Sequence, residues 1–219
     1  RRVPLRRDER VYFGEFWQLL AERLRELNAQ NVGYDSLGWE ALQKLRNAHR
    51  ADYRELPELI TEMRKIKSKQ EISWLRKAAE LAIKGMARAA ELIEEGRSEL
   101  EIAAEAEYAM RRSGSEGTPF NTIVASGKNS WLPHATVTRR RLRRGELMVV
   151  DLGAIYKGYA SDMARTFSLV PTRKQLKLSD VAKRAQEAAI KRVRDGVKAA
   201  NVDKAAREVI RRAGYEKFC

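Results

Sequence analysis

The order of helix and strand patterns along the chain predicts an α+β fold. A small fragment with one strand between two helices comes first, and it is followed by two helices, a group of strands and two further helices. Within the strand group, a turn pattern joins two short strands, as in an antiparallel hairpin. Helices grouped on one side of an antiparallel sheet define this class, so we expect that arrangement here.

The N-terminal fragment is predicted to be part of a small α/β domain. Apolar residues at helical spacing predict a helix over residues 15–27. A short strand over residues 31–35 follows, and a second helix begins near Ser36 or Gly38. The pattern favours helices that each bury one face.

Residues 52–62 are predicted to be a linker, because they contain a proline and mixed charges. The expected domains are therefore residues 1–62, a partial N-terminal domain with its linker, and residues 63–219, the main domain. His49 lies at or just beyond the end of the second helix. No acid-rich neighbour lies at ligand spacing from it, so we interpret it as a surface or helix-capping residue.

Two capping boxes predict two helices at the start of the main domain. In the first box, Ser68 and Glu71 precede a long helix that runs to about residue 95 and is closed by Gly96. In the second, Ser98 and Glu101 open a helix that stops at residues 113–114. A strand is then predicted over residues 119–127. The two closing helices are expected over residues 179–194 and 202–213, each followed by a glycine.

Two aspartates interrupt the strand pattern between residues 147 and 167. Residues 147–150 are typical of a buried strand, and the segment from Tyr156 is typical of a turn back to a second strand. With a two-residue loop at Tyr156 and Lys157, Asp151 would face Asp162 directly. Carboxylates so placed have Cβ atoms roughly 5 Å apart and repel each other. We therefore predict one or two divalent cations between them.

Composition excludes several classes of protein. The chain has 219 residues, 43% of them hydrophobic and 34% charged, and no apolar run approaches the ~20 residues of a membrane helix. No signal peptide is visible, so a cytoplasmic protein with no membrane partner is expected. The one cysteine, Cys219, excludes a disulfide framework and a thiolate metal cluster.

The net charge of +14 raises the question of a nucleic-acid partner. Basic residues are mostly scattered among acids, and only residues 1–10 and 139–144 form clusters. We interpret these clusters as solvated faces, with an anionic partner or substrate as the alternative. His134, taken alone, is interpreted as a core or edge histidine.

Several motifs together carry a resemblance to a known family. They are SGKNSWLPH at residues 126–134, LRRGE at 142–146, DLG at 151–153 and GYASDMARTF at 158–167, with EMRKIKSKQEI at 62–72 at the entry to the main domain. In this order and spacing they resemble the pita-bread metallopeptidases, within them the Xaa-Pro dipeptidase and aminopeptidase (prolidase) branch. The resemblance covers nearly the whole chain.

The resemblance implies a fold and a chemistry. The fold is a pita-bread (creatinase/aminopeptidase-like) catalytic domain, with helices on a curved antiparallel sheet, preceded by part of an α/β domain. Asp151 and Asp162 match two ligands of a centre of two divalent ions (Mn, Co or Zn), and His134 matches a histidine that contacts substrate. The implied enzyme is a homodimer that cuts the bond between an N-terminal residue and proline with a hydroxide that bridges the metals.

The chain also departs from the family pattern. The family uses a further histidine and two glutamates as ligands, and no histidine follows His134. We therefore expect a catalytic domain that is incomplete at its C-terminus, a chain truncated at both ends, and weak or no metal binding and no activity for this chain alone. The alternatives are a non-catalytic pita-bread protein that binds nucleic acid or another acidic partner, and a sister enzyme of the methionine aminopeptidase or creatinase type.

Overall fold

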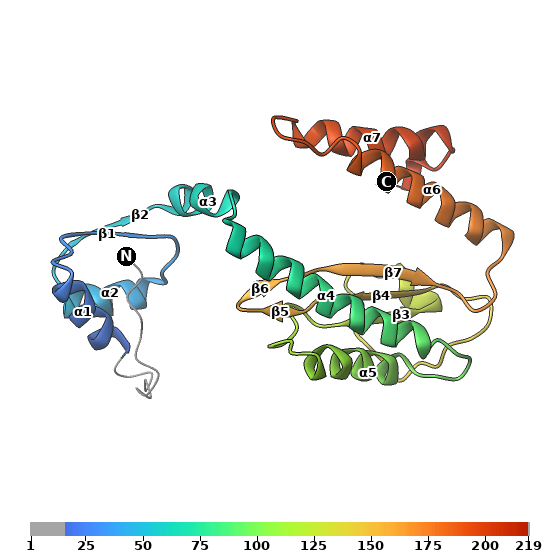
Figure 1. Cartoon of the computed structure of the whole chain (residues 1–219), viewed down its shortest axis with the longest axis horizontal. Helices are drawn as coiled ribbons and strands as arrows, with labels where there is room; N and C mark the ends of the chain where they lie inside the picture. The colour runs from blue at the N-terminus through green and yellow to red at the C-terminus, as the bar shows by residue number, and fades with distance from the viewer. Residues whose placement is uncertain (1–15, 219) are drawn as a thin grey trace. The chain divides into compact units, whose positions relative to one another are not determined.

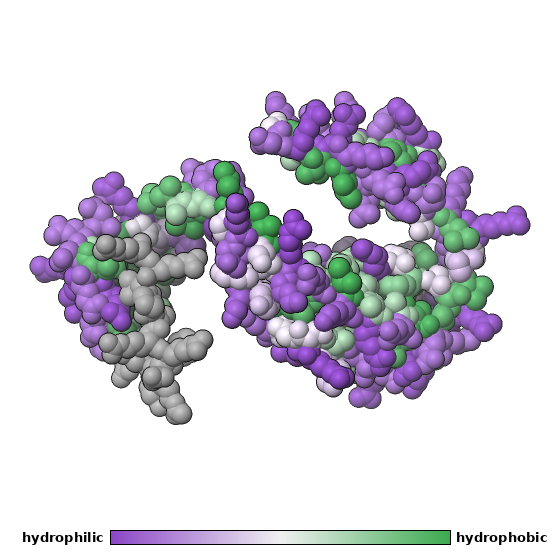
Figure 2. All heavy atoms as spheres, viewed as in Figure 1, coloured by the Kyte–Doolittle hydropathy of each residue, from purple (hydrophilic) through white to green (hydrophobic). Residues whose placement is uncertain are grey.

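The computed structural model describes residues 16–218, and its contacts divide the chain into two units, Arg1–Ser68 and Lys69–Cys219. Each unit combines helices and strands (Figure 1). Most of the face shown in Figure 2 is hydrophilic, in keeping with the 34% of charged residues. Among the described residues, no helix is long and apolar enough to cross a membrane.

The first unit contains a parallel pair of strands. Its elements are α1 (Phe16–Glu26), β1 (Asn31–Tyr34), α2 (Trp39–Ala48), β2 (Asp52–Glu55) and α3 (Pro57–Lys65). β1 and β2 pair from Asn31 with Asp52 to Tyr34 with Glu55. The predicted helix, strand and helix before residue 50 are confirmed.

The prediction of a linker over residues 52–62 is wrong. This segment forms β2 and most of α3, because its backbone pairs with β1 and Tyr53 is buried. Pro57 does not break the helix, since it occupies the first turn of α3, where its missing N–H costs no hydrogen bond. The predicted domain boundary after residue 62 falls inside α3, whereas the contacts divide the chain after Ser68.

His49 caps α2. Its backbone N–H donates to the Leu45 carbonyl, and its Nδ1 lies 2.9 Å from the hydroxyl of Tyr53. The capping interpretation is confirmed, but the side chain is buried rather than at the surface because it packs on the Tyr53 ring.

The second unit holds an antiparallel sheet with the order β3-β4-β7 and a short β5-β6 hairpin. Its helices and strands are α4 (Lys69–Glu91), α5 (Glu99–Arg112), β3 (Ile123–Ser126), the 3₁₀ helix η1 (Gly127–Trp131), β4 (Met148–Leu152), β5 (Ile155–Tyr156), β6 (Tyr159–Ala160), β7 (Met163–Phe167), α6 (Arg173–Ile190), α7 (Ala199–Arg212) and the 3₁₀ helix η2 (Glu216–Phe218). The predicted α+β class is confirmed.

The core of this unit lies between one face of the sheet and helices α4 and α5 (Figure 1). Along β4, Met148, Val150 and Leu152 are buried, whereas Val149 and Asp151 are only half-buried. Successive side chains of a strand point to opposite faces, so β4 turns its apolar residues to the helices and Asp151 to the other face. The core packing therefore fixes which way Asp151 points.

Helix ends follow local capping more closely than apolar periodicity. The box of Ser98 and Glu101 is present at the start of α5, as predicted. α6 begins at Arg173 rather than at residue 179, because Thr172 and Gln175 form a capping box that the sequence interpretation overlooked. α4 ends at Glu91, short of residue 95, and the predicted strand over residues 119–127 is restricted to Ile123–Ser126.

The turn between β5 and β6 differs from the prediction by one residue. Its two central residues are Lys157 and Gly158, with φ of 52° and 76°. Two successive positive φ values are typical of a type I′ turn, and a glycine at the second position accepts them without strain. The Glu116 carboxylate accepts the backbone N–H groups of both residues. Asp151 consequently faces Ala164 on β7, and the predicted direct pairing with Asp162 is wrong.

Gly153, directly after β4, permits a very close approach to Ser161, which lies shortly before β7. A Cβ atom at Gly153 would lie 2.2 Å from the Ser161 carbonyl oxygen and 2.7 Å from the Pro119 ring. Both neighbours belong to backbone or to a stiff ring, so neither can move away cheaply. A side chain at this position would therefore push apart the segments that carry Asp151 and Asp162.

We predict that Gly153→Ala destabilises the protein by roughly 1–3 kcal/mol, the usual cost of overpacking. The midpoint of urea unfolding measures this loss. Gly117→Ala is the matched control, because a Cβ there would meet only an Arg111 side-chain nitrogen at 3.9 Å. Equal stability of the two variants would contradict the close approach.

Candidate metal and substrate site

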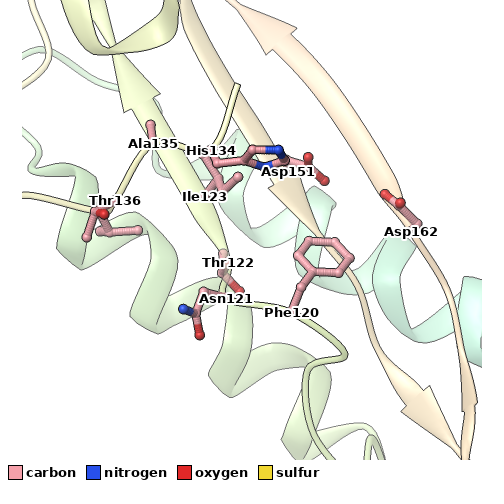
Figure 3. A pocket seen from close by; sticks show the side chains of 10 residues that line it. Phe120, Asn121, Thr122, Ile123, His134, Ala135, Thr136, Asp151 and Asp162 are labelled. Carbon is pink, nitrogen blue, oxygen red and sulfur yellow. The ribbon is translucent and has the colours of Figure 1, made fainter. Parts of the chain in front are cut away.

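The sheet face opposite the core opens onto a cavity of about 600 Å³. His134, Asp151 and Asp162, the three residues singled out from the sequence, all line it (Figure 3). Its full lining is Phe120, Asn121, Thr122, Ile123, His134, Ala135, Thr136, Val137, Asp151 and Asp162. The fold thus brings the three candidate residues to one place.

Asp151 comes from the central strand of the sheet. It lies opposite Ile123 of β3 on one side and Ala164 of β7 on the other. Strand β4 is therefore held by backbone hydrogen bonds along both edges at this position. A side chain on such a strand has a fixed origin, which suits a ligand or catalytic group.

Asp162 enters the cavity from the segment between β6 and β7. It is two residues before Ala164, so the two positions share a face of the sheet and Asp162 lies diagonally across from Asp151. In Figure 3 the two carboxyl groups point toward the space between them. Asp162 is exposed, whereas Asp151 is half-buried.

The electrostatic environment disfavours the charge on Asp151. Burial, the nearby Asp162 carboxylate and a hydrogen bond with it raise the pKa of Asp151, and the proximity of His134 lowers it by a smaller amount. One of its oxygens, Oδ1, is buried and has no hydrogen-bond partner among residues 16–218. A bound cation would supply both the missing partner and the compensating charge.

The donors of this cavity fit part of a divalent metal site. Carboxylate oxygens suit Mn²⁺ and similar ions, and Asp151, which lines the cavity, has one oxygen without a hydrogen-bond partner among residues 16–218. Within the part of the chain that the structure describes, however, no three His, Cys, Asp or Glu side chains are grouped closely enough to hold a metal ion. Asp151 and Asp162 by themselves would form a labile site.

His134 lies on the connection between η1 and β4. It is exposed and follows Pro133, while the next residue, Ala135, is buried and anchors the segment. Its ring is near Asp151 in Figure 3. An imidazole at this edge can donate or accept a proton within the cavity.

Sequence reasoning overlooked the wall of the cavity that precedes β3. Phe120 turns its ring toward the two aspartates, and Thr122 has a buried hydroxyl oxygen without a hydrogen-bond partner in the described chain. Their position in the sequence was the available signal. Both residues lie within three positions before β3, and β3 pairs with β4, the strand that carries Asp151. An apolar ring beside polar groups is typical of a ligand pocket.

The basic cluster at residues 139–144 is partly used inside the fold. Arg140 pairs with Glu146, Arg141 donates to the Gly96 carbonyl, and Arg144 lies 3.2 Å from Glu95. These contacts favour a structural role for part of the cluster over an anionic partner. The second basic cluster, residues 1–10, lies outside the described residues.

We predict that Asp151→Asn raises the thermal stability of the metal-free protein at pH 7. The raised pKa means that the folded state binds the Asp151 proton more tightly than the unfolded state. The contribution of Asp151 to the free energy of unfolding is fully present below its pKa in the unfolded chain, about 4. It is lost as the pH rises through its pKa in the folded state. The asparagine variant avoids this loss because it carries no charge.

Thermal unfolding between pH 4 and pH 8 with a chelator present tests this effect. Asp195→Asn is the control, since it removes the same charge from an exposed position. The expected result is an Asp151→Asn curve that diverges from wild type as pH rises. Parallel curves for Asp151→Asn and wild type would contradict the raised pKa of Asp151.

Comparison with known proteins places this cavity in a family context. Residues 73–219 match the model of metallopeptidase family M24. The Xaa-Pro dipeptidase of Pyrococcus furiosus is 35% identical over 94% of this chain and 58% of that protein. The chain thus spans less than two thirds of the length of the relatives that it matches.

Solved structures show the same relationship. The X-Pro aminopeptidase from Thermotoga maritima superposes with a TM-score of 0.85 at 31% identity, over 94% of this chain and 60% of that one. The prolidase from Pyrococcus furiosus gives a TM-score of 0.80 at 34% identity, with the same two coverages. With the pita-bread helices and sheet in place and a family match over most of its length, the chain belongs to metallopeptidase family M24.

Proposed function

We propose that this chain carries part of the active site of a metal-dependent exopeptidase that hydrolyses the bond between an N-terminal residue and proline. The observation that carries the proposal is the convergence of Asp151, Asp162 and His134 on one cavity in a chain of the M24 family. The substrate class rests on the names of the relatives, which are an Xaa-Pro dipeptidase and an X-Pro aminopeptidase.

Asp151 and Asp162 are proposed as metal ligands. Asp151 comes from β4 and Asp162 directly precedes the neighbouring strand β7, and both present their oxygens to a common space (Figure 3). When bound there, divalent ions supply positive charge for the scissile carbonyl and a nucleophilic water at neutral pH. Strand β4 fixes the origin of Asp151, and Asp162 directly precedes the paired strand β7, so little reorganisation is needed when the ions bind.

His134 is proposed to handle the substrate and a proton. An imidazole N–H at the edge of the cavity can donate to the oxygen that gains charge during hydrolysis, or pass its proton to the leaving proline nitrogen. That nitrogen belongs to a tertiary amide and has no N–H of its own, so it cannot donate a hydrogen bond to the enzyme. The Phe120 ring offers an apolar surface against which a substrate side chain or proline ring can lie.

Finer parts of the proposal concern ion, assembly and location. We propose two Mn, Co or Zn ions per complete site, a homodimer and a cytoplasmic location. The sister activities of the same scaffold, methionine aminopeptidase and creatinase-like hydrolysis, are the alternatives. Profiling Xaa-Pro, Met-Xaa and creatine substrates separates the three.

We predict that Mn²⁺ or Co²⁺ raises the unfolding temperature of the chain through Asp151 and Asp162. A ligand at 100 times its Kd stabilises the folded state by about 2.7 kcal/mol. Asp151→Asn and Asp162→Asn should each lose this response, whereas Asp195→Asn should keep it. Thermal unfolding with increasing metal concentration measures the effect, and a response of the same size in all four proteins would place the ion elsewhere.

We further predict no turnover of an Xaa-Pro dipeptide by this 219-residue chain alone with added Mn²⁺ or Co²⁺. The described residues bring together only two carboxylates, which hold a metal weakly. A longer polypeptide that contains this chain and spans the length of the relatives should hydrolyse the dipeptide. In that protein His134→Ala should lower kcat by roughly 10²–10⁴-fold, the usual contribution of a general acid or base.

Release of free proline measures turnover. Asp195→Asn is the control variant in the 219-residue chain and in the longer polypeptide. Turnover by the 219-residue chain would contradict the expected incompleteness of the site. Full activity of His134→Ala in the longer polypeptide would contradict the role proposed for this histidine.

A further inference from the structure

Glu99 is a fully buried carboxylic acid outside the cavity. It is the first residue of α5, and its side chain is 0% exposed. A carboxylate is seldom buried unless hydrogen bonds and opposite charges compensate for its lost hydration. Its partners therefore indicate what the residue does.

Every recorded partner of the Glu99 carboxylate is a donor. Oε1 accepts from the backbone N–H and the hydroxyl of Ser126, both at 2.7 Å, and from the side-chain amide of Asn129 at 3.4 Å. Oε2 accepts from the backbone N–H of Thr138 at 3.2 Å and from its hydroxyl at 2.6 Å. An ionised carboxylate only accepts hydrogen bonds, so this arrangement satisfies both oxygens at once.

The backbone of α5 holds the same segment. The N–H of Glu99 donates to the Arg140 carbonyl at 3.0 Å, and the N–H of Leu100 donates to the Thr138 carbonyl at 3.1 Å. These N–H groups have no partner within their own helix, because they belong to its first turn. The N-terminus of α5 thus binds residues 138–140 in two ways. The Glu99 carboxylate accepts hydrogen bonds from Thr138, and the backbone N–H groups of Glu99 and Leu100 donate to the carbonyls of Arg140 and Thr138.

The positive charge of Arg140 lies close enough to interact with the Glu99 carboxylate, although its direct ion pair is with Glu146. Its guanidinium donates to the Ser126 hydroxyl at 2.7 Å and to Glu146 at 2.5 Å, so it links the end of β3 to the start of β4. Ser126 in turn donates to Glu99. The buried acid is therefore part of one connected polar network, and removal of one member leaves the others unsatisfied.

The two ends of the network enclose the loop that carries His134. Asn129 and Ser126 lie before this loop, Thr138 lies after it, and all three contact the same carboxylate. We infer that Glu99 is a positioning residue that clamps both ends of the loop over residues 130–137 and so fixes His134 at the cavity. The catalytic consequence of this clamp rests on the function proposed above for His134.

Histidine NMR signals provide a direct test, because the chain has only His49 and His134. His49 is buried beside Tyr53 in the first unit and serves as an internal reference. We expect Glu99→Gln to displace or split the ring signals of His134 in the metal-free, substrate-free protein. The amide NH₂ would face a backbone N–H at one of the two ends, and that end would be released. The His49 signals should not move.

A second pair of variants keeps the test sound if Glu99→Gln does not fold. Thr138→Val removes the exposed hydroxyl, which donates to Glu99 and accepts from the backbone N–H of Arg140, and it leaves the backbone bond from Thr138 to Glu99 in place. It should displace the His134 signals in the same direction, whereas Thr138→Ser should restore them. Glu101→Ala is the control for loss of helix capping, because Glu101 contacts Ser98 and not the loop.

Unchanged His134 signals in Thr138→Val or in a folded Glu99→Gln would overturn the inference. So would an equal displacement by Glu101→Ala, since that result would mean a general loss of helix stability. The measurement needs neither metal nor turnover, so a failure to hydrolyse Xaa-Pro dipeptides would count against the proposed function and leave the clamp unaffected.

Discussion

The alternation of side chains along β4 is the constraint on which the rest of this molecule depends. Val150 and Leu152 are fully buried against the helices, and this packing leaves no freedom in the direction of Asp151. A slip by one residue would move the buried apolar side chains of the strand out of the core and the acid into it. The same apolar contacts that stabilise the sheet therefore orient the candidate metal ligand.

The acid pair is held against its own electrostatics. Burial and the Asp162 carboxylate disfavour the charged form of Asp151, and hydrogen bonds between Ala154 and Ser161 hold the adjoining segments together. Such strain persists only where the surrounding structure determines the geometry. Asp151 within β4 and Asp162 directly before the paired strand β7 meet that condition, in contrast to two acids on flexible loops.

The sequence predicted the fold class and the meeting of the two acids, although it gave the wrong turn. The loop lies at Lys157 and Gly158, which shifts the partner of Asp151 by two residues, from Asp162 to Ala164. Because the side-chain period of a strand is two, this error left both acids on the same face. Periodicity therefore carried the prediction, whereas exact register depended on positive φ at Lys157, which sequence alone did not specify.

Other parts of the site depend on contacts between distant segments, and these left no local pattern to find. Glu99 looked like a first-turn acid of a capped helix, yet its carboxylate lies within hydrogen-bond distance of Ser126 and Thr138, far along the chain. Backbone pairing between β4 and β7 holds Asp151 directly and Asp162 through the adjoining residue Met163, but a loop has no such ladder of hydrogen bonds. A histidine on such a loop can have a fixed position only if other groups hold the two ends of the loop. A buried carboxylate that accepts hydrogen bonds from both ends satisfies this requirement. The imidazole itself then remains free to exchange a proton.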